Sequence, residues 1–249
     1  MFRKIKYEFL NAMGNFFAIF FGFIFPPFMC LLIYGITTID IPEVNVNIAN
    51  ELFINFMLLL PLVTLMLGFG ALISQEMEKS INIRLALFGY NEKQQLITKL
   101  LVQLGMLMIE VLVFCAVTLP FMPVQTPSVI VATLYSFCML MVGIIFAVIA
   151  YSLSLYFKKF SICYGIMMGI YFLMMILSGM MGIRPEQLPA FIKPLANLMP
   201  LTQMVMTFSR SWAGSIDNLA PLLQSFIFLG SISGLMLIIA LRKENRGKV

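Results

Sequence analysis

Histidine is missing from this 249-residue chain, and charged side chains make up only 11% of it. Without histidine there is no Ser-His or Cys-His catalytic pair, no histidine-ligated zinc and no histidine proton relay. The chain also lacks a G-x-x-x-x-G-K-[ST] phosphate loop and any polar segment long enough to fold into a nucleotide-binding domain. We therefore expect no catalytic, cofactor-binding or metal-binding residues, and any ATP that drives the protein must bind to another polypeptide.

Hydrophobic residues, in contrast, make up 61% of the sequence, and the mean hydropathy is +0.99. A water-soluble fold could not hide this much apolar surface, and apolar runs long enough to cross a bilayer recur along the chain. We predict an all-α polytopic membrane protein that forms one domain over residues 1–249. Its six transmembrane helices are expected at residues 16–34, 52–73, 100–119, 129–157, 162–183 and 219–241. In the first of them Gly22, Pro26 and Pro27 predict a kink.

The distribution of basic residues predicts the orientation. If the six spans alternate, all but three of the 16 lysines and arginines lie on one side, and only Arg184, Lys193 and Arg210 lie on the other. By the positive-inside rule both termini are cytoplasmic in the cell membrane. The net charge of +5 is then explained by topology and by contact with anionic lipid, and it gives no reason to expect nucleic acid as a partner.

The first 15 residues predict an amphipathic helix that lies along the inner membrane surface. Phe2, Ile5, Phe9 and Met13 recur at helical spacing, with polar positions that include Glu8 between them. Such a helix is either an interfacial anchor or also a contact for a cytoplasmic partner.

The loop between the second and third spans is the most charged part of the chain. Ile81, Leu85 and Phe88 share one helical face there, and such a short helix is marginal in water unless that face packs against something. Gly89 suits the end of this helix, and Asn91 suits the start of the next one. The pattern predicts a short cytoplasmic helix, a turn, and the beginning of the third span.

The segment between the fifth and sixth spans is too apolar to be left in water, yet it is interrupted by proline. Its prolines are Pro185, Pro189, Pro194 and Pro200. They exclude a continuous seventh span and favour short re-entrant helices on the outer side, which require a surrounding of protein or a cavity.

Glu110 is the sole ionisable residue deep within a predicted span, and Gln103 lies on the same helical face. A carboxylate at this depth is expensive unless it faces protein or water. Glu110 is therefore either a hydrogen-bonding group at a helix contact or a cargo contact in a translocation path. Gln103, on the same face, is expected to lie in the same environment.

In this arrangement the chain resembles the ABC-2 type permeases of ABC transporters. The resemblance is carried by the basic amphipathic start, by a loop that opens with Glu76-Met-Glu78-Lys79 and closes on Lys99-Leu-Leu, and by the proline-broken outer segment Leu188-Pro-Ala-Phe-Ile-Lys-Pro-Leu-Ala-Asn-Leu-Met-Pro200-Leu-Thr. It covers nearly the whole chain and identifies a superfamily without naming a cargo.

The resemblance implies a half-transporter in which two permeases, identical or homologous, each rest on one ATPase subunit that binds ATP and Mg. The loop helix would then be a coupling helix, with contributions from Glu76, Glu78, Lys79, Arg84, Leu85 and Phe88. The outer segment would be an extracellular gate formed by Pro189, Phe191, Pro194, Leu195, Leu198 and Pro200. Gln103 and Glu110 would line the translocation path.

The 21 methionines and 24 phenylalanines favour an adaptable apolar passage, and hence an amphiphilic or hydrophobic cargo such as a peptide, a bacteriocin or a drug. Two other classes stay open. A secondary transporter or channel would need no ATPase, but it would predict more ionisable groups at mid-membrane and internal repeats. A membrane scaffold or immunity protein would transport nothing. The composition fits a bacterial origin, but only loosely.

Overall fold

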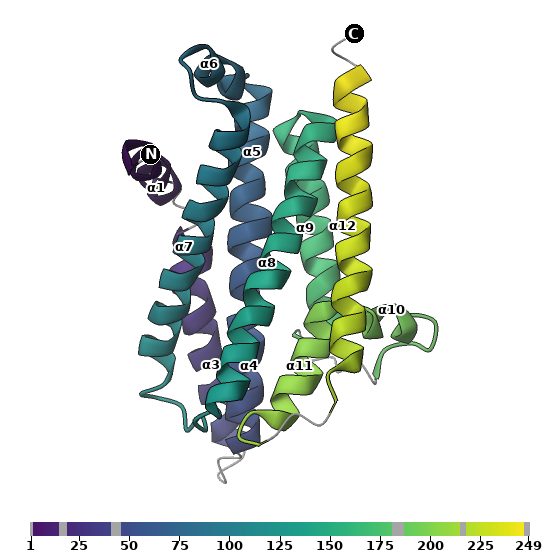
Figure 1. Cartoon of the computed structure of the whole chain (residues 1–249). Helices are drawn as coiled ribbons and strands as arrows, with labels where there is room; N and C mark the ends of the chain where they lie inside the picture. Colours follow the sequence, from purple (N-terminus) through teal and green to yellow (C-terminus); the bar gives the residue numbers. More distant parts are fainter. Residues whose placement is uncertain (1, 15–18, 41–45, 181–186, 215–217, 247–249) are drawn as a thin grey trace.

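The computed structural model describes residues 2–14, 19–40, 46–180, 187–214 and 218–246, and these are helical with short connections (Figure 1). The elements in chain order are α1 (Phe2–Met13), η1 (Phe20–Ile24), α3 (Phe25–Asp40), α4 (Val46–Pro61), η2 (Leu62–Gly68), α5 (Phe69–Glu78), α6 (Ile81–Leu87), α7 (Glu92–Thr118), α8 (Val129–Phe157), α9 (Phe160–Ser178), α10 (Lys193–Asn197), α11 (Pro200–Ser211) and α12 (Ala220–Arg246). The predicted all-α fold is confirmed.

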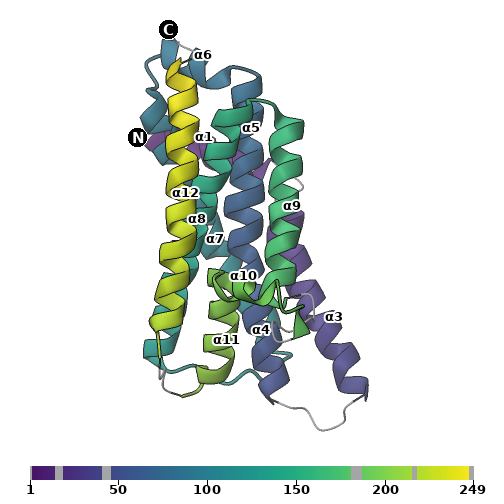
Figure 2. The same ribbon diagram turned by 90° about the vertical axis from the view of Figure 1, so that its right-hand side faces the viewer.

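Six helices are long and apolar enough to cross a membrane. They are Phe20–Thr38, Val46–Glu78, Glu92–Thr118, Val129–Phe157, Phe160–Ser178 and Ala220–Asn245. The second, which joins α4, η2 and α5, stands at the centre of the bundle: 89% of its most apolar window is buried, against 22% in the first and the sixth spans. Helices α3, α7, α8, α9 and α11 pack against it, and α12 lies farther out against α8 and α11 (Figures 1 and 2).

Two of the spans contain π-helical turns, and both turns lie beside prolines. Proline has no N–H to donate to the carbonyl four residues earlier, so the regular helical ladder is interrupted at this point. In η1, just before Pro26 and Pro27, the Phe25 N–H bonds to the Phe20 carbonyl, five residues back. The segment η2, in contrast, begins directly after Pro61. The first span thus has a π-helical turn next to the prolines from which a kink was predicted.

The helix bounds differ from the predicted ones at several points. The second span is longer than residues 52–73, since it continues to Glu78, and the third begins at Glu92. The fifth span is shorter than residues 162–183, because α9 ends at Ser178 where Gly179 takes a positive φ of 84°. Glycine adopts this left-handed conformation without strain, and it commonly ends a helix. Residues 181–183 lie outside the described part of the chain.

The helix α1 packs across α7, with Ile5, Phe9 and Ala12 on the contacting side. The expectation that Glu8 belongs to the polar, solvent-facing side was wrong. Glu8 is buried against α7 because it forms an ion pair there with Lys99. The outward side instead shows Tyr7, Leu10 and Met13.

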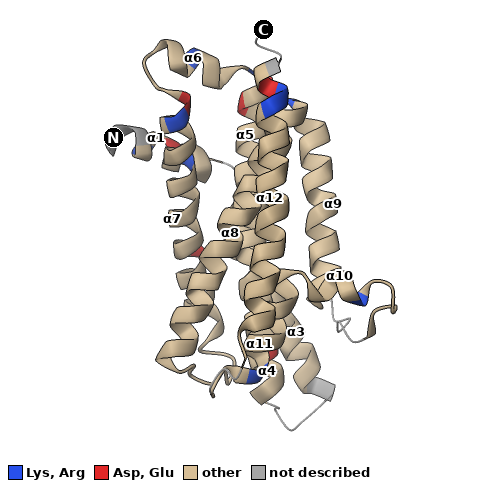
Figure 3. Cartoon of the chain, turned by 45° about the vertical axis from the view of Figure 1, so that its right-hand side comes forward, with Lys and Arg blue, Asp and Glu red and all other residues tan. Residues whose placement is uncertain are grey.

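Charged residues gather at one end of the bundle, beside α6 and the C-terminal end of α12 (Figure 3). We call this the basic end. Its lysines and arginines include Lys79, Arg84, Lys93, Lys99, Lys158, Lys159, Arg242 and Lys243. The outer segment with α10 and α11 lies toward the opposite end, packed among α4, α8, α9 and α12.

Candidate functional site

The short helix α6 projects beyond the ends of the spans at the basic end (Figures 1 and 2). Ile81 and Leu85 are half-buried toward the bundle, whereas Leu87 is 83% exposed and Phe88 is 89% exposed. The three residues expected to share a face are therefore split, because Phe88 follows the last helical residue and turns outward. Ile83, also exposed, lies one helical turn before Leu87. The sequence pattern did not single out Ile83 or Leu87.

The turn that leads into α6 is fixed by backbone geometry. Lys79 caps α5, and Ser80 takes a left-handed conformation with φ 53°. The Glu78 carboxylate at the end of α5 accepts a hydrogen bond from the Phe160 N–H, 3.1 Å away, at the start of α9. An acidic group at a helix N-terminus satisfies an unpaired N–H and complements the helix dipole. Glu78 therefore anchors the turn between α5 and α6 to the start of α9. Lys79 and Arg84 are exposed to solvent.

The loop after α6 is held by a buried amide. Gln95 donates from Nε2 to the Tyr90 carbonyl at 2.5 Å and to the Asn82 carbonyl at 3.1 Å. Gly89 has a positive φ of 78°, and Asn91 caps α7 by accepting from the Lys93 N–H. The predicted helix, turn and second helix are thus present. The role of Gln95 had no signal in the sequence, because its partners are backbone carbonyls.

Three helices meet in a buried ionic cluster. Lys99 Nζ of α7 lies 2.6 Å from Glu76 Oε2 of α5 and 3.3 Å from Glu8 Oε1 of α1. Burial raises the pKa of Glu8 above its usual value, with Lys99 acting against that rise and Glu76 adding to it. Glu76 thus forms an ion pair within the protein. Together with Lys99 and Glu8 it holds the end of α5, from which α6 follows.

Glu110 lies at a contact between three helices. It is buried, and its carboxylate accepts a hydrogen bond from the Thr64 hydroxyl in η2. A Cβ on Gly22 of η1 would collide with the same carboxylate. Gln103, also buried, lies two turns earlier in α7. Neither lines the two cavities described below. This placement favours the structural alternative for Glu110 within one protomer.

The outer segment forms two short helices separated by Pro200, which begins α11. Of the residues expected to seal a gate, Phe191 is 82% exposed and Leu195 is also exposed, whereas Leu198 is half-buried and Pro200 is buried. Pro189 and Pro194 are exposed. The six residues therefore form no closed seal within a single chain.

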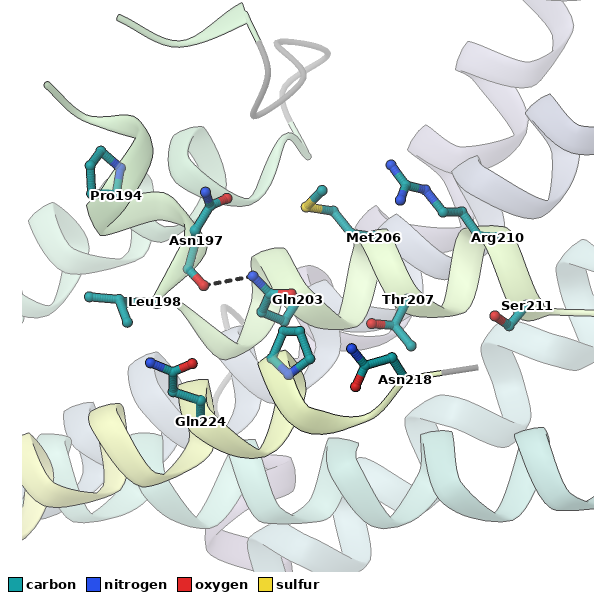
Figure 4. A pocket seen from close by; sticks show the side chains of 11 residues that line it. Pro194, Asn197, Leu198, Gln203, Met206, Thr207, Arg210, Ser211, Asn218 and Gln224 are labelled. Atoms are coloured by element: carbon teal, nitrogen blue, oxygen red, sulfur yellow. Dashed lines mark hydrogen bonds between the residues drawn. The ribbon is translucent and has the colours of Figure 1, made fainter. Parts of the chain in front are cut away.

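An open cleft of about 740 Å³ lies between this segment and the start of α12 (Figure 4). Pro194 and Leu198 contribute to one side, and Arg210 lies at the other end. Between them are carboxamides and hydroxyls, including Gln203, which donates to the Asn197 carbonyl at 2.6 Å. The polar side of α11 thus faces the cleft.

The opposite side of α11 is anchored in the bundle by aromatic residues. Phe208 packs edge-on against Tyr135 with ring centroids 4.9 Å apart, and Trp212 contacts Tyr135 and Phe53. Trp212 also donates from Nε1 to the Gln125 carbonyl at 2.8 Å. The chain's single tryptophan therefore fixes the end of α11 to the loop between α7 and α8.

The chain matches a known protein family. Residues 2–211 match the family described as ABC-2 type transporter, and they include every element from α1 to α11. No curated protein matches the chain.

Proposed function

This chain belongs to the ABC-2 type transporter family, and we propose that it is the permease subunit of an ATP-driven exporter whose ATP and Mg are bound by a separate ATPase. The match extends over most of the chain, and the sequence contains no phosphate loop of its own. In this proposal the basic end is cytoplasmic, so both termini are on the ATPase side.

The observation that carries the proposal is the exposed apolar surface of α6. Ile83, Leu87 and Phe88 are exposed at the end richest in lysine and arginine, which the positive-inside rule assigns to the cytoplasm. An exposed group of large apolar residues in water marks a contact with a partner. We assign this surface to the ATPase, and α6 is then the coupling helix.

The connections of α6 explain how closure of the ATPase would reach the membrane. The helix follows α5, the last part of the central span, after the two-residue turn Lys79-Ser80. Glu78 links that junction to α9, and the Glu76–Lys99–Glu8 cluster links it to α7 and α1. Movement of α6 therefore acts on the core of the bundle.

A second permease, identical or homologous, would complete the assembly on the outer side. Phe191 and Leu195 are exposed in one chain, so a gate formed by them requires a facing copy. The outer cleft beside them would receive cargo after the gate. An amphiphilic or hydrophobic cargo, such as a peptide or a drug-like molecule, suits a cleft with both amide and apolar side chains.

The test is a pair of aspartate substitutions on α6, Leu87→Asp and Phe88→Asp. Anchor residues of an interface contribute about 2 kcal/mol or more each, so the double variant should lose its co-purifying ATPase and its ATP-driven transport. Phe121→Asp is the matched control, since Phe121 is 69% exposed but lies in the loop after α7 at the opposite end.

Folding is checked separately by the unfolding temperature in detergent. If the double variant retains the wild-type ATPase and transport, the coupling role of α6 is wrong. If no ATPase co-purifies with the wild-type protein from its native membrane, an ATP-independent transporter or a membrane scaffold becomes the better reading.

A further inference from the structure

A small hollow opens at the basic end, between α5, α6, α7, α8 and α12. Its volume is about 50 Å³, which is room for a few water molecules or for the head group of one long side chain. It lies directly behind α6, because Asn82 of that helix is part of its wall.

The wall of the hollow is acidic although the surrounding surface is basic. Glu76, Glu92 and Glu244 line it, and Lys99 is the sole lysine or arginine among its lining residues. Lys99 is already shared between Glu76 and Glu8. Lys243 lies outside the hollow, 3.6 Å from the centroid of the Tyr156 ring, and donates to the Tyr156 carbonyl.

Two amide oxygens in the same wall have no hydrogen-bond donor among the described residues. Gln95 is 3% exposed, and both bonds of its Nε2 are made, yet its Oε1 accepts nothing. The Oδ1 of Asn82 is likewise buried and accepts no hydrogen bond from the described residues. Buried acceptors are normally satisfied, and each exception calls for an explanation such as a missing bound group. A donor that reaches either oxygen from the hollow would satisfy it.

We propose that this hollow is a receptor site for one cationic side chain, an arginine or a lysine, of the ATPase subunit. The wall offers carboxylates and amide oxygens, which only accept hydrogen bonds, so the complementary ligand is a cation with several N–H donors. The inference rests on the proposed function, because that function brings the ATPase to α6.

A bound metal ion fits the site less well than a side chain. Within the described part of the chain, no three His, Cys, Asp or Glu side chains lie close enough together to hold a metal. A guanidinium or ammonium group needs no such convergence, since its donors spread toward separate acceptors. The apolar surface of α6 and the acidic hollow behind it would then form two neighbouring parts of one interface.

The experiment measures the affinity of the permease, reconstituted in nanodiscs, for the ATPase that co-purifies with it. Glu92→Gln combined with Glu244→Gln keeps the shape of the hollow and removes two charges. We expect this variant to bind the ATPase at least about tenfold more weakly and with a smaller loss of affinity on addition of salt. The control, Gln75→Lys with Asn245→Lys, adds the same two units of charge at exposed positions outside the hollow and should bind normally.

A competitor gives a second measurement that needs no mutation. Agmatine, which carries a guanidinium group, should displace the ATPase from the wild type but not from the double variant, and it should displace it from the wild type more effectively than sodium chloride does at equal ionic strength. Wild-type affinity in the double variant, or equal loss in the charge control, would overturn the assignment of the hollow. The proposed function would survive either result if Leu87→Asp with Phe88→Asp still abolished binding, and it would fail if the wild type bound no ATPase.

Discussion

Replacement of Lys99 by methionine should loosen the attachment of α1 and destabilise the protein at neutral pH. The substitution keeps the apolar stem of the side chain and removes the ammonium group that lies between Glu8 and Glu76. Both carboxylates then remain inside the protein with a like charge beside them. Removal of one partner from a buried ion pair typically costs about 3–5 kcal/mol.

The structure also sets the pH dependence of this effect. Glu8 is the deeper of the two carboxyl groups, and it can escape the loss of Lys99 by binding a proton. At pH 7, about 2.5 units above its ordinary pKa of 4.5, protonation costs ~3.4 kcal/mol. This free energy of protonation is the upper limit of the destabilisation that an unpaired Glu8 can cause at pH 7. The limit falls by ~1.4 kcal/mol for each unit by which the pH is lowered, so the variant should approach the wild type near pH 5.

The assay is thermal unfolding in detergent, followed by the fluorescence of the single tryptophan, Trp212, with labelling of an Ala12→Cys variant as a local probe of α1. Ala12 is buried against α7, so its labelling should accelerate when α1 detaches. Lys93→Met serves as the control, because Lys93 is exposed in the same helix. If Lys99→Met matched the wild type at pH 7, or if its deficit grew as the pH fell, the cluster could not be a buried ion pair.

Two further predictions concern the packing around Glu110. Gly22→Ala should destabilise the protein by about 1–3 kcal/mol because the new methyl group meets the Glu110 carboxylate. Gly105→Ala is the control, since its methyl group meets open space and should be neutral or stabilising. Equal unfolding temperatures for the two variants would contradict this reasoning. Thr64→Val should cost about 1–3 kcal/mol because it leaves the Glu110 carboxylate without its buried donor. Thr118→Val is its control, since the Thr118 hydroxyl bonds to a carbonyl of its own helix and its loss should matter less.

The architecture could be predicted from the sequence because hydropathy and helix breakers act locally. The fourth span, residues 129–157, agrees with α8, where Ser128 caps the start, and Gly89 and Asn91 mark the turn before α7. The ends of the second span could not be placed this way. Its polar last turn, residues 75–78, is held by polar contacts with distant helices, namely the Glu76–Lys99 ion pair and the hydrogen bond from the Phe160 N–H to Glu78. Hydropathy does not register such contacts.

The functional residues were harder to predict, because their roles depend on which helices become neighbours. Glu76 was expected to contribute to coupling, but nothing in the sequence indicated that it pairs with Lys99 from the next span. The period of 3.6 residues suggested one face for Ile81, Leu85 and Phe88, but the helix ends at Leu87 and Phe88 turns away. The site assignments for coupling, path and gate remain predictions, whereas membership of the family is established.

The burial of the second span has a consequence for biogenesis. Helices of a polytopic protein enter the bilayer roughly in the order of synthesis, so this span must wait in lipid until α7, α8, α9 and α11 arrive to enclose it. Thr64, a polar residue near the middle of this span, gains Glu110 as a hydrogen-bond partner only when the third span has been inserted. An apolar surface on all sides is compatible with both lipid and protein, since hydrocarbon tails are as apolar as leucine side chains. The same composition therefore lets the segment survive as an isolated helix early in synthesis and become the innermost one at the end.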